Sequence, residues 1–341
     1  MENNQAIPGY EVVRKLGSGA MAGVYLARQV SLDRLVAIKI LPSKFSANTD
    51  YINRFQKEGK AAAKLNHPNI VAAVDVGAVG QRHYFVMEYV DGTDVHELLK
   101  KKGKLPERRA LEIIQEIALA LQHAHGKGFL HRDIKPRNIM ITKAGVAKLA
   151  DLGLARHVDD TETAEAEKNK AFGTPFYISP EQIRGKMDIA APADIYGLGA
   201  TFYHMVTGKV PFTGANPKEV MKAHLKEELV PPDHLNSELS SGCAQIIEHM
   251  LARRVEDRYH SADDLLIDLE LVMQGLPPKF ARSGLDASVL AETAAAAAAA
   301  TAIPTQVAKP AVASAPPTWM IAALVGSLFV NLLLFILYLL K

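Results

Sequence analysis

The sequence is poor in the residues that build disulfide frameworks and metal clusters. Among its 341 residues there is one cysteine, Cys243, so neither a disulfide framework nor a cysteine-based zinc cluster is available. A reducing compartment is compatible with this. Charge of either sign is also nearly cancelled, since 39 lysines and arginines against 37 aspartates and glutamates leave a formal net charge of +2. No excess of basic charge therefore favours nucleic acid as a partner.

The densest group of chemically active side chains lies between residues 131 and 153. It reads HRDIKPRN and, further on, DLG. Phosphoryl transfer needs a base near the acceptor hydroxyl, a cation at the migrating phosphate and oxygen ligands for Mg²⁺. We therefore predict that Asp133 accepts or orients the hydroxyl proton and that Lys135 stabilises the transferred phosphate. Asn138 and Asp151 are predicted to hold Mg²⁺, or Mn²⁺ in its place.

Each of these motifs also occurs by chance in ordinary loops, so the prediction depends on their order. Upstream lie a glycine-rich run at 16–24, the run VAIK ending in Lys39, and Glu58 in a helical segment. In this order the motifs resemble the eukaryotic-type (Hanks-type) serine/threonine protein kinases, most closely their bacterial members, from about Tyr10 to about Val272. The resemblance implies an α+β, bilobal fold with a small β-rich N-lobe and a larger helical C-lobe. It also implies transfer of the γ-phosphate of ATP to Ser/Thr hydroxyls of proteins.

The resemblance and the composition together divide the chain into four parts. We expect an N-terminal tail at 1–9, a protein kinase domain at 10–275, an Ala/Pro-rich linker at 276–318 and an apolar helix at 319–340. Within the kinase domain the N-lobe should occupy about 10–88 and the C-lobe about 92–275. A hydrophobic content of 48% is enough for one large domain with additional segments.

The glycine-rich run lies between two strand-like segments, 10–16 and 24–27. Glycine lets a backbone hairpin close over phosphates because no side chain intervenes. This copy departs from the family pattern, since the third glycine position holds Ala22. Lys39 ends an alternating β-branched run, which predicts a strand that points the lysine into a cleft. The resemblance implies that Lys39 bridges phosphate to Glu58, on a helix predicted at 54–65. Gly59 inside this helix suggests one that moves easily.

The segment 83–92 is interpreted as a buried strand that runs into the hinge between the lobes. An ordinary core strand and loop remain the alternative, because recognition by backbone atoms leaves no side-chain signature. The resemblance makes Met87 the gatekeeper, gives adenine hydrogen bonds to the backbone of two hinge residues, and places two apolar side chains on its faces and a carboxylate at the ribose. The ATP-binding residues so implied, besides Lys39, Asn138 and Asp151, are Leu16, Gly17, Ser18, Gly19, Val24, Ala37, Met87, Glu88, Val90 and Asp94.

Residues 154–181 show no convincing hydrophobic period and end in GTPFYISPE, which resembles a kinase activation segment. Thr161 and Thr163 lie among acidic residues and are candidate phosphorylation sites, with Arg132 as the cation that receives the phosphate. A solvated acidic loop is the alternative. The resemblance implies instead that Thr174 bonds the catalytic aspartate and lysine.

Several residues are expected to act structurally. The resemblance implies that Glu181 pairs with Arg258, which ties the activation segment to the C-lobe, and that Asp194 steadies the backbone of the catalytic loop. The usual Ala-Pro-Glu ending is Ser-Pro-Glu here, and we expect Ser179 to matter little. His125 lies on an apolar helix and is expected to pack rather than to bind a ligand.

The C-terminal part is expected to be a linker and a membrane anchor. Residues 319–340 carry no charge over 22 positions. As a helix they would span about 33 Å, enough for a hydrocarbon core of about 30 Å. We therefore expect a tail-anchored, single-pass protein of the cell membrane with a cytoplasmic kinase domain; a cleaved lipid-anchor signal is the disfavoured alternative. Small and polar residues four positions apart, Ala323, Ser327 and Asn331, suggest a homodimer.

Two other functional classes are alternatives to a signalling kinase that phosphorylates itself and other proteins. One is a pseudokinase that acts as a membrane-anchored binding scaffold. It is disfavoured because Lys39, Glu58, Asp133, Asn138 and Asp151 are all present. The other is a small-molecule kinase, which the segment 173–181 disfavours because it resembles a peptide-docking element.

Overall fold

The computed structural model describes residues 7–18, 22–42, 49–151, 156–157 and 175–281. The chain divides into two units, Met1–Ser283 and Gly284–Lys341, and the second lies outside the described residues. The predictions for Gly19, Thr161, Thr163 and Thr174, for the linker beyond 281 and for the helix at 319–340 also lie outside them. In the described part of the chain, no helix combines the length and apolarity needed to cross a bilayer.

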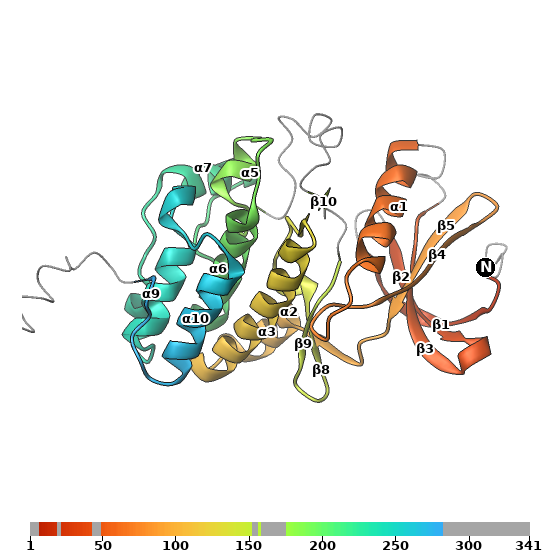
Figure 1. The fold of residues 1–341 in the computed structure, drawn as a ribbon, viewed down its shortest axis with the longest axis horizontal. Helices are drawn as coiled ribbons and strands as arrows, with labels where there is room; N and C mark the ends of the chain where they lie inside the picture. The colour runs from red at the N-terminus through yellow and green to blue at the C-terminus, as the bar shows by residue number, and fades with distance from the viewer. Residues whose placement is uncertain (1–6, 19–21, 43–48, 152–155, 158–174, 282–341) are drawn as a thin grey trace, which may run out of the picture. The chain divides into compact units, whose positions relative to one another are not determined.

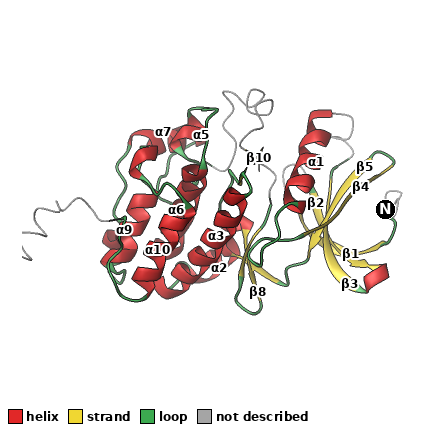
Figure 2. Cartoon of the chain, in the orientation of Figure 1, coloured by secondary structure: helices red, strands yellow, loops and turns green. Residues whose placement is uncertain are grey.

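The N-terminal part is built on a five-stranded antiparallel sheet with the strand order β1-β2-β3-β5-β4. One helix, α1, lies beside the sheet, and a short 3₁₀ turn, η1, connects β2 to β3 (Figures 1 and 2). The elements are β1 (Tyr10–Ser18), β2 (Gly23–Gln29), η1 (Val30–Leu32), β3 (Arg34–Ile40), α1 (Thr49–Ala63), β4 (Ala73–Val79) and β5 (Arg82–Glu88). The predicted strands and helix therefore exist, and most are longer than predicted.

The predicted N-terminal tail ends earlier than residue 9. Ile7 is buried with an exposure of 3% and packs in a small cluster with Ile38 and Val86 of the sheet. The N–H of Tyr10 donates to the carbonyl of Ile7 at 3.1 Å, which turns the chain into β1. An apolar side chain before the first strand therefore covers part of the sheet, and the folded part begins at or before Ile7.

Gly59 has a packing reason in the structure. It is buried on the face of α1 that meets β4 and β5, and a Cβ at this position would collide with the side chain of Val76 and press on Phe85. Glycine thus lets the helix approach the sheet closely. The interpretation of Gly59 as the mark of an easily moved helix is not needed to explain it.

The C-terminal part is mainly helical and carries two small sheets at its edge (Figure 2). The long helix α3 supplies the centre of its core, because Ile113, Ile114, Ile117 and Leu121 are all fully buried. The elements are β6 (Gly92–Asp94), α2 (Val95–Lys102), α3 (Glu107–Gly126), β7 (Phe129–Leu130), η3 (Pro136–Asn138), β8 (Ile139–Thr142), β9 (Ala147–Leu149), β10 (Arg156–His157), α5 (Pro180–Ile183), α6 (Ala191–Thr207), α7 (Pro217–Lys226), α8 (Pro232–Leu235), α9 (Ser241–Met250), η4 (Val255–Asp257) and α10 (Ala262–Met273).

The folded domain extends past its predicted end at 275. The carboxylate of Asp268, fully buried on α10, accepts hydrogen bonds from the backbone N–H of Lys279 at 2.6 Å and of Ala281 at 2.9 Å. The hydroxyl of Tyr259 donates to it at 2.8 Å, and Ala281 is itself buried. The proline-rich composition of 277–281 suggested linker, but the buried carboxylate holds this segment on the core.

A buried histidine joins α6 to α7 in the C-terminal core. His224 is fully buried, and its Nδ1 lies 2.7 Å from the hydroxyl of Tyr196. Its ring also packs on Phe212, with centroids 4.7 Å apart. Burial lowers the pKa of His224 to about 4, so the imidazole is neutral at pH 7.

This histidine should make the stability of the domain fall in mild acid. The pKa of His224 in the folded protein is about 4, below the value of roughly 6.5 in an unfolded chain, so the unfolded state binds the proton first as pH falls. The contribution is complete above pH 6.5 and is lost between pH 6.5 and 4, by about 2 to 3 kcal/mol. Denaturant unfolding across this range should show a shallower decline for His224→Gln. The variant His234→Gln, at an exposed site, should decline as the wild type does; equal slopes for all three proteins would contradict the assignment.

Candidate active site

The HRD segment is held by one buried carboxylate. Asp194, in the first turn of α6, accepts hydrogen bonds from the N–H of His131 at 2.8 Å and the N–H of Arg132 at 2.6 Å. The ring Nε2 of His125 lies 2.9 Å from the same carboxylate. Burial alone would raise the pKa of Asp194, but the hydrogen bonds from His125 and from the backbone of His131 lower it. His125, predicted only to pack, therefore orients Asp194.

The carboxylate of Asp194 stabilises a strained backbone conformation at Arg132. Arg132 has a φ of 67°, in the left-handed region that costs a residue with a side chain about 1 kcal/mol or more. Because its N–H and that of His131 both point at Asp194, the turn is fixed in this conformation. Asp133 follows directly, so its position depends on that turn.

Asp133 lies among polar neighbours that the sequence brings together. The ammonium of Lys135 forms an ion pair with its carboxylate. The amide Nδ2 of Asn138 donates to the carbonyl of Asp133 at 2.8 Å and to its carboxylate at 3.2 Å. These three predicted residues therefore form one hydrogen-bonded group.

His131 joins this group to the segment before Asp151. Its Nε2 lies 3.2 Å from the carbonyl of Ala150, and its Nδ1 accepts from the N–H of Asp133 at 3.3 Å. The N–H of Ala150 also donates to the carbonyl of Asn138 at 2.8 Å. The two motifs are thus fixed against each other by local hydrogen bonds.

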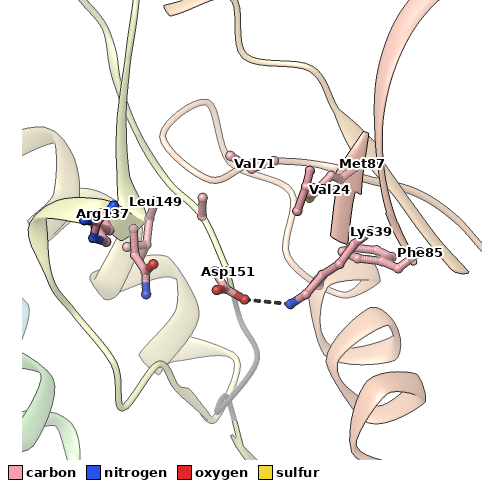
Figure 3. Close-up of a pocket in the computed structure, with 11 residues that line it drawn as sticks. Val24, Lys39, Val71, Phe85, Met87, Arg137, Leu149 and Asp151 are labelled. Atoms are coloured by element: carbon pink, nitrogen blue, oxygen red, sulfur yellow. Dashed lines mark hydrogen bonds and ion pairs between the residues drawn. The ribbon is translucent and has the colours of Figure 1, made fainter. Parts of the chain in front are cut away.

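Asp151 forms an ion pair with Lys39 across a cavity (Figure 3). The ammonium of Lys39, on β3, lies 2.9 Å from the carboxylate. Desolvation of the partly exposed carboxylate at the cavity would raise the pKa of Asp151, but the charge and hydrogen bond of Lys39 lower it to about 2. Asp151 is therefore ionised at neutral pH, and its φ of 62° is again left-handed.

The cavity has a volume of about 180 Å³ and mixes apolar walls with a charged end (Figure 3). Its walls are held together because the N–H of Val71 donates to the carbonyl of Leu149 at 2.9 Å, which joins the segment before β4 to β9. The lining residues are Val24, Lys39, Ala62, Val71, Phe85, Met87, Arg137, Asn138, Leu149, Ala150 and Asp151.

Some of the predicted ATP-binding residues line the cavity and others do not. Val24, Lys39, Met87, Asn138 and Asp151 line it as the resemblance implies. Among the described residues, its lining does not include the other ATP-binding predictions, which lie on the sheet, in the hinge or at the start of α2: Leu16, Gly17, Ala37, Glu88, Val90 and Asp94. The side chains of Ser18 and Glu58 lie outside the described residues, although Ser18 ends β1 and Glu58 lies on α1.

Two residues predicted to bind the nucleotide, Glu88 and Asp94, form contacts within the protein. The carboxylate of Glu88 forms an ion pair with Lys148 of β9 at 2.9 Å, which ties the end of β5 to the C-terminal part. Asp94 accepts from the N–H of Glu97 at 2.8 Å and so caps the N-terminus of α2. One carboxylate oxygen of Asp94 is therefore occupied before any ligand binds.

Sequence reasoning missed the apolar lining of the cavity. Val71, Phe85 and Leu149 belong to buried runs that also suit an ordinary core, so nothing in their pattern distinguished them. Leu149 and Ala150 directly precede the DLG motif, and that adjacency was the available signal. Arg137, which lies between the predicted Lys135 and Asn138, also lines the cavity and was not predicted to do so.

A buried ion pair anchors the end of the activation segment. The guanidinium of Arg258 donates two parallel hydrogen bonds to the carboxylate of Glu181, at 2.8 and 3.0 Å. The side chain of Arg258 is fully buried and also donates to the carbonyls of Ala252, Pro192 and Arg253. The buried guanidinium thus has hydrogen-bond acceptors that compensate for its removal from water.

A family model described as "Protein kinase domain" matches residues 10–267. The chain belongs to this protein kinase family. The resemblance inferred from the motifs is thereby confirmed, as is the two-lobed fold.

This chain is similar to curated bacterial proteins. It is 39% identical over 263 residues to a probable serine/threonine-protein kinase of Clostridium perfringens, covering 77% of this chain and 38% of the relative. It is 38% identical over 274 residues to the serine/threonine-protein kinase PknB of Mycobacterium tuberculosis, covering 79% of this chain and 44% of that protein. The kinase thus matches less than half the length of these relatives.

Loss of Arg258 should destabilise the kinase domain strongly. Arg258→Ala leaves the buried carboxylate of Glu181 without its partner, which costs about 3 to 5 kcal/mol. The matched control is Arg254→Ala, which removes an arginine whose ion pair with Glu256 is largely exposed and should change the stability little. Denaturant unfolding measures both, and similar losses for the two variants would contradict the importance of the buried pair.

Proposed function

We propose that this chain is an ATP-dependent serine/threonine protein kinase. The observation that carries the proposal is the continuity of the site: Asn138 hydrogen-bonds Asp133 and lines the same cavity as the ion pair of Lys39 and Asp151. A candidate base, a candidate metal ligand and a phosphate-binding cation are therefore adjacent. The printed names of the relatives support serine or threonine acceptors.

The residues suit ATP and Mg²⁺. Since the Nδ2 of Asn138 donates to Asp133, its amide oxygen is the atom left for a cation, and ionised Asp151 supplies carboxylate oxygens. Amide and carboxylate oxygens are ligands that Mg²⁺ prefers, with phosphate oxygens and water completing its coordination. When bound, the metal offsets charge on the phosphates. Val24 and Met87 offer apolar contact to a purine base.

The reaction assigns a separate role to each residue. Asp133 orients the acceptor hydroxyl and takes its proton while the oxygen bonds to the γ-phosphorus and the bond to the ADP oxygen breaks. Lys135 stabilises the charge of the moving phosphoryl group. Lys39, which contacts Asp151 in this structure, can exchange that contact for phosphate oxygens because the Asp151 side chain is 48% exposed.

A pseudokinase scaffold is the rival. It would keep the fold while losing a group needed for turnover. Asp133, Lys135 and Asn138 instead form a connected group whose members suit phosphoryl transfer, and Lys39 faces Asp151. The rival therefore has no feature of the described site in its favour.

Replacing Asp133 should abolish transfer without abolishing ATP binding. Asp133→Asn removes the proton acceptor and should lower the rate by about 10²- to 10⁴-fold. The measurement is transfer of labelled phosphate from ATP and Mg²⁺ to a serine/threonine-containing protein, with calorimetric ATP binding alongside. The control Asp263→Asn changes an exposed aspartate of α10 and should keep the wild-type rate. Equal rates for wild type and Asp133→Asn would refute the catalytic assignment.

We also propose that the kinase phosphorylates its own activation segment. Thr161 and Thr163 are the candidate sites, with Arg132 as the receiving cation. The position of Arg132 next to Asp133 supports this, since a phosphate bound there would stabilise the turn that holds the base. Phosphopeptide mapping of the protein from the same labelling reaction identifies the modified residues, and unmodified threonines in active protein would remove the proposal.

We further propose a membrane-tethered signalling enzyme with a cytoplasmic kinase domain. The uncharged run at 319–340, its length as a helix and the need of a kinase for ATP support this. The spacing of Ala323, Ser327 and Asn331 supports association of two copies through this segment.

Disrupting the apolar run should release the protein from membranes. Leu333→Arg combined with Leu334→Arg places two charges in the span, each costing about 2.5 to 3.5 kcal/mol at the centre of a bilayer. Membrane fractionation should recover wild type with the lipid and the double variant in the soluble fraction. Leu333→Ile with Leu334→Ile is the matched control and should stay with the lipid. Wild type in the soluble fraction would refute the anchor.

A further inference from the structure

A buried amide joins the end of the activation segment to the catalytic loop. Ser179 is fully buried and precedes α5, where its hydroxyl donates to the Oε1 of Gln182 at 2.9 Å. The N–H of Ser179 donates to the same oxygen at 3.2 Å, and the N–H of Gln182 donates back to the Ser179 hydroxyl oxygen at 3.4 Å. This reciprocal arrangement is a capping box. It fixes which end of the Gln182 amide points away from the helix.

The other end of that amide points at Arg132. Since Oε1 receives two hydrogen bonds, Nε2 is free to face outward, and it donates to the carbonyl of Arg132 at 2.8 Å. Gln182 is buried, with an exposure of 6%, so water is poorly placed to replace the donor. Ser179 was expected to matter little; instead, its hydroxyl orients the amide that reaches the catalytic loop.

This contact completes the restraint on the left-handed turn. Asp194 holds the N–H of Arg132, and Gln182 holds its carbonyl. The carbonyl of Arg132 lies in the same rigid peptide plane as the nitrogen of Asp133. Rotating that plane would therefore move the Cα of Asp133 and swing its carboxylate.

The residue next to Gln182 is held by a buried ion pair. This residue, Glu181, is locked by the two hydrogen bonds from buried Arg258. The donor that restrains Asp133 is thus carried on the anchored end of the activation segment. A displacement of that end would be transmitted to the base through the hydrogen bond from Gln182 to Arg132.

We propose that Gln182 is a positioning residue for Asp133, oriented by Ser179, which couples the docked end of the activation segment to the catalytic base. This inference rests on the proposed kinase function. Gln182 touches neither nucleotide nor acceptor in this role, so it should act on the chemical step and leave substrate binding nearly unchanged.

The test compares Gln182→Glu with wild type in the full chain. The variant keeps the shape of the side chain, but a carboxylate cannot donate to the carbonyl of Arg132. We expect kcat for a peptide substrate to fall by about 10-fold, while KM for ATP and for the peptide stays within about 2-fold. The control Gln274→Glu makes the same change at an exposed position of the chain and should alter neither constant.

Ser179→Ala provides the second variant. It keeps the Gln182 amide and removes the hydroxyl that orients it, so kcat should fall by about 2- to 5-fold. If both residues act through one contact, the double variant should match Gln182→Glu alone instead of showing the product of the two effects. Ser179→Ala also decides the matter should Gln182→Glu unfold, as seen from its melting temperature.

Three outcomes would overturn the inference. An unchanged kcat in Gln182→Glu, or in folded Ser179→Ala when the first variant unfolds, excludes a positioning role. A peptide KM that rises while kcat holds shows that Gln182 shapes the docking surface only. Multiplicative effects in the double variant show two independent contacts. Inactivity of the wild type itself would refute the proposed function and this inference with it, whereas an active wild type with unaffected variants refutes the inference alone.

Discussion

The site depends on one buried carboxylate that holds a strained turn. Asp194 accepts two consecutive backbone N–H groups, and without it Arg132 would relax from its left-handed conformation. Asp133 directly follows that turn, and Asn138 is hydrogen-bonded to Asp133. A residue far along the chain therefore sets the geometry of the HRD segment. The arrangement requires an ionised Asp194 in the interior, which the hydrogen bonds from His125 and the backbone of His131 favour.

The sequence and the family resemblance pointed to residues that carry a motif signature, including Asp194, Glu181 and Arg258, whose contacts are distant along the chain, and missed residues without such a signature. The order of motifs identified Asp133, Asn138 and Asp151, and alternation identified β3 with Lys39, because catalysis and strand periodicity leave direct signatures. Ser179 carried no such signature, since a serine in place of alanine acquires a role only when the carbonyl of Arg132 lies beside Gln182. The same holds for Ile7, whose burial requires the completed sheet.

Two ion pairs of the kinase differ in exposure, and this difference suits them to different tasks. Arg258 and Glu181 are almost completely buried, so separating them would strand a charge at a cost of about 3 to 5 kcal/mol. Lys39 and Asp151 have side chains that are 15% and 48% exposed, so water or phosphate can replace either partner at small cost. The first pair fixes a segment in place. The second can open to admit a ligand without disturbing the fold.

Among the described residues, two buried carboxylates, Asp194 and Asp268, accept backbone N–H groups, with different consequences for the backbone. At Asp194 the carboxylate stabilises the strained, left-handed turn of Arg132 next to the cavity. At Asp268 the carboxylate accepts the N–H groups of Lys279 and Ala281, after a segment that two prolines exclude from continuing α10, and holds these residues on the core. In both places the carboxylate comes from a helix of the C-terminal core, whose packing therefore positions both the catalytic loop and the segment 279–281.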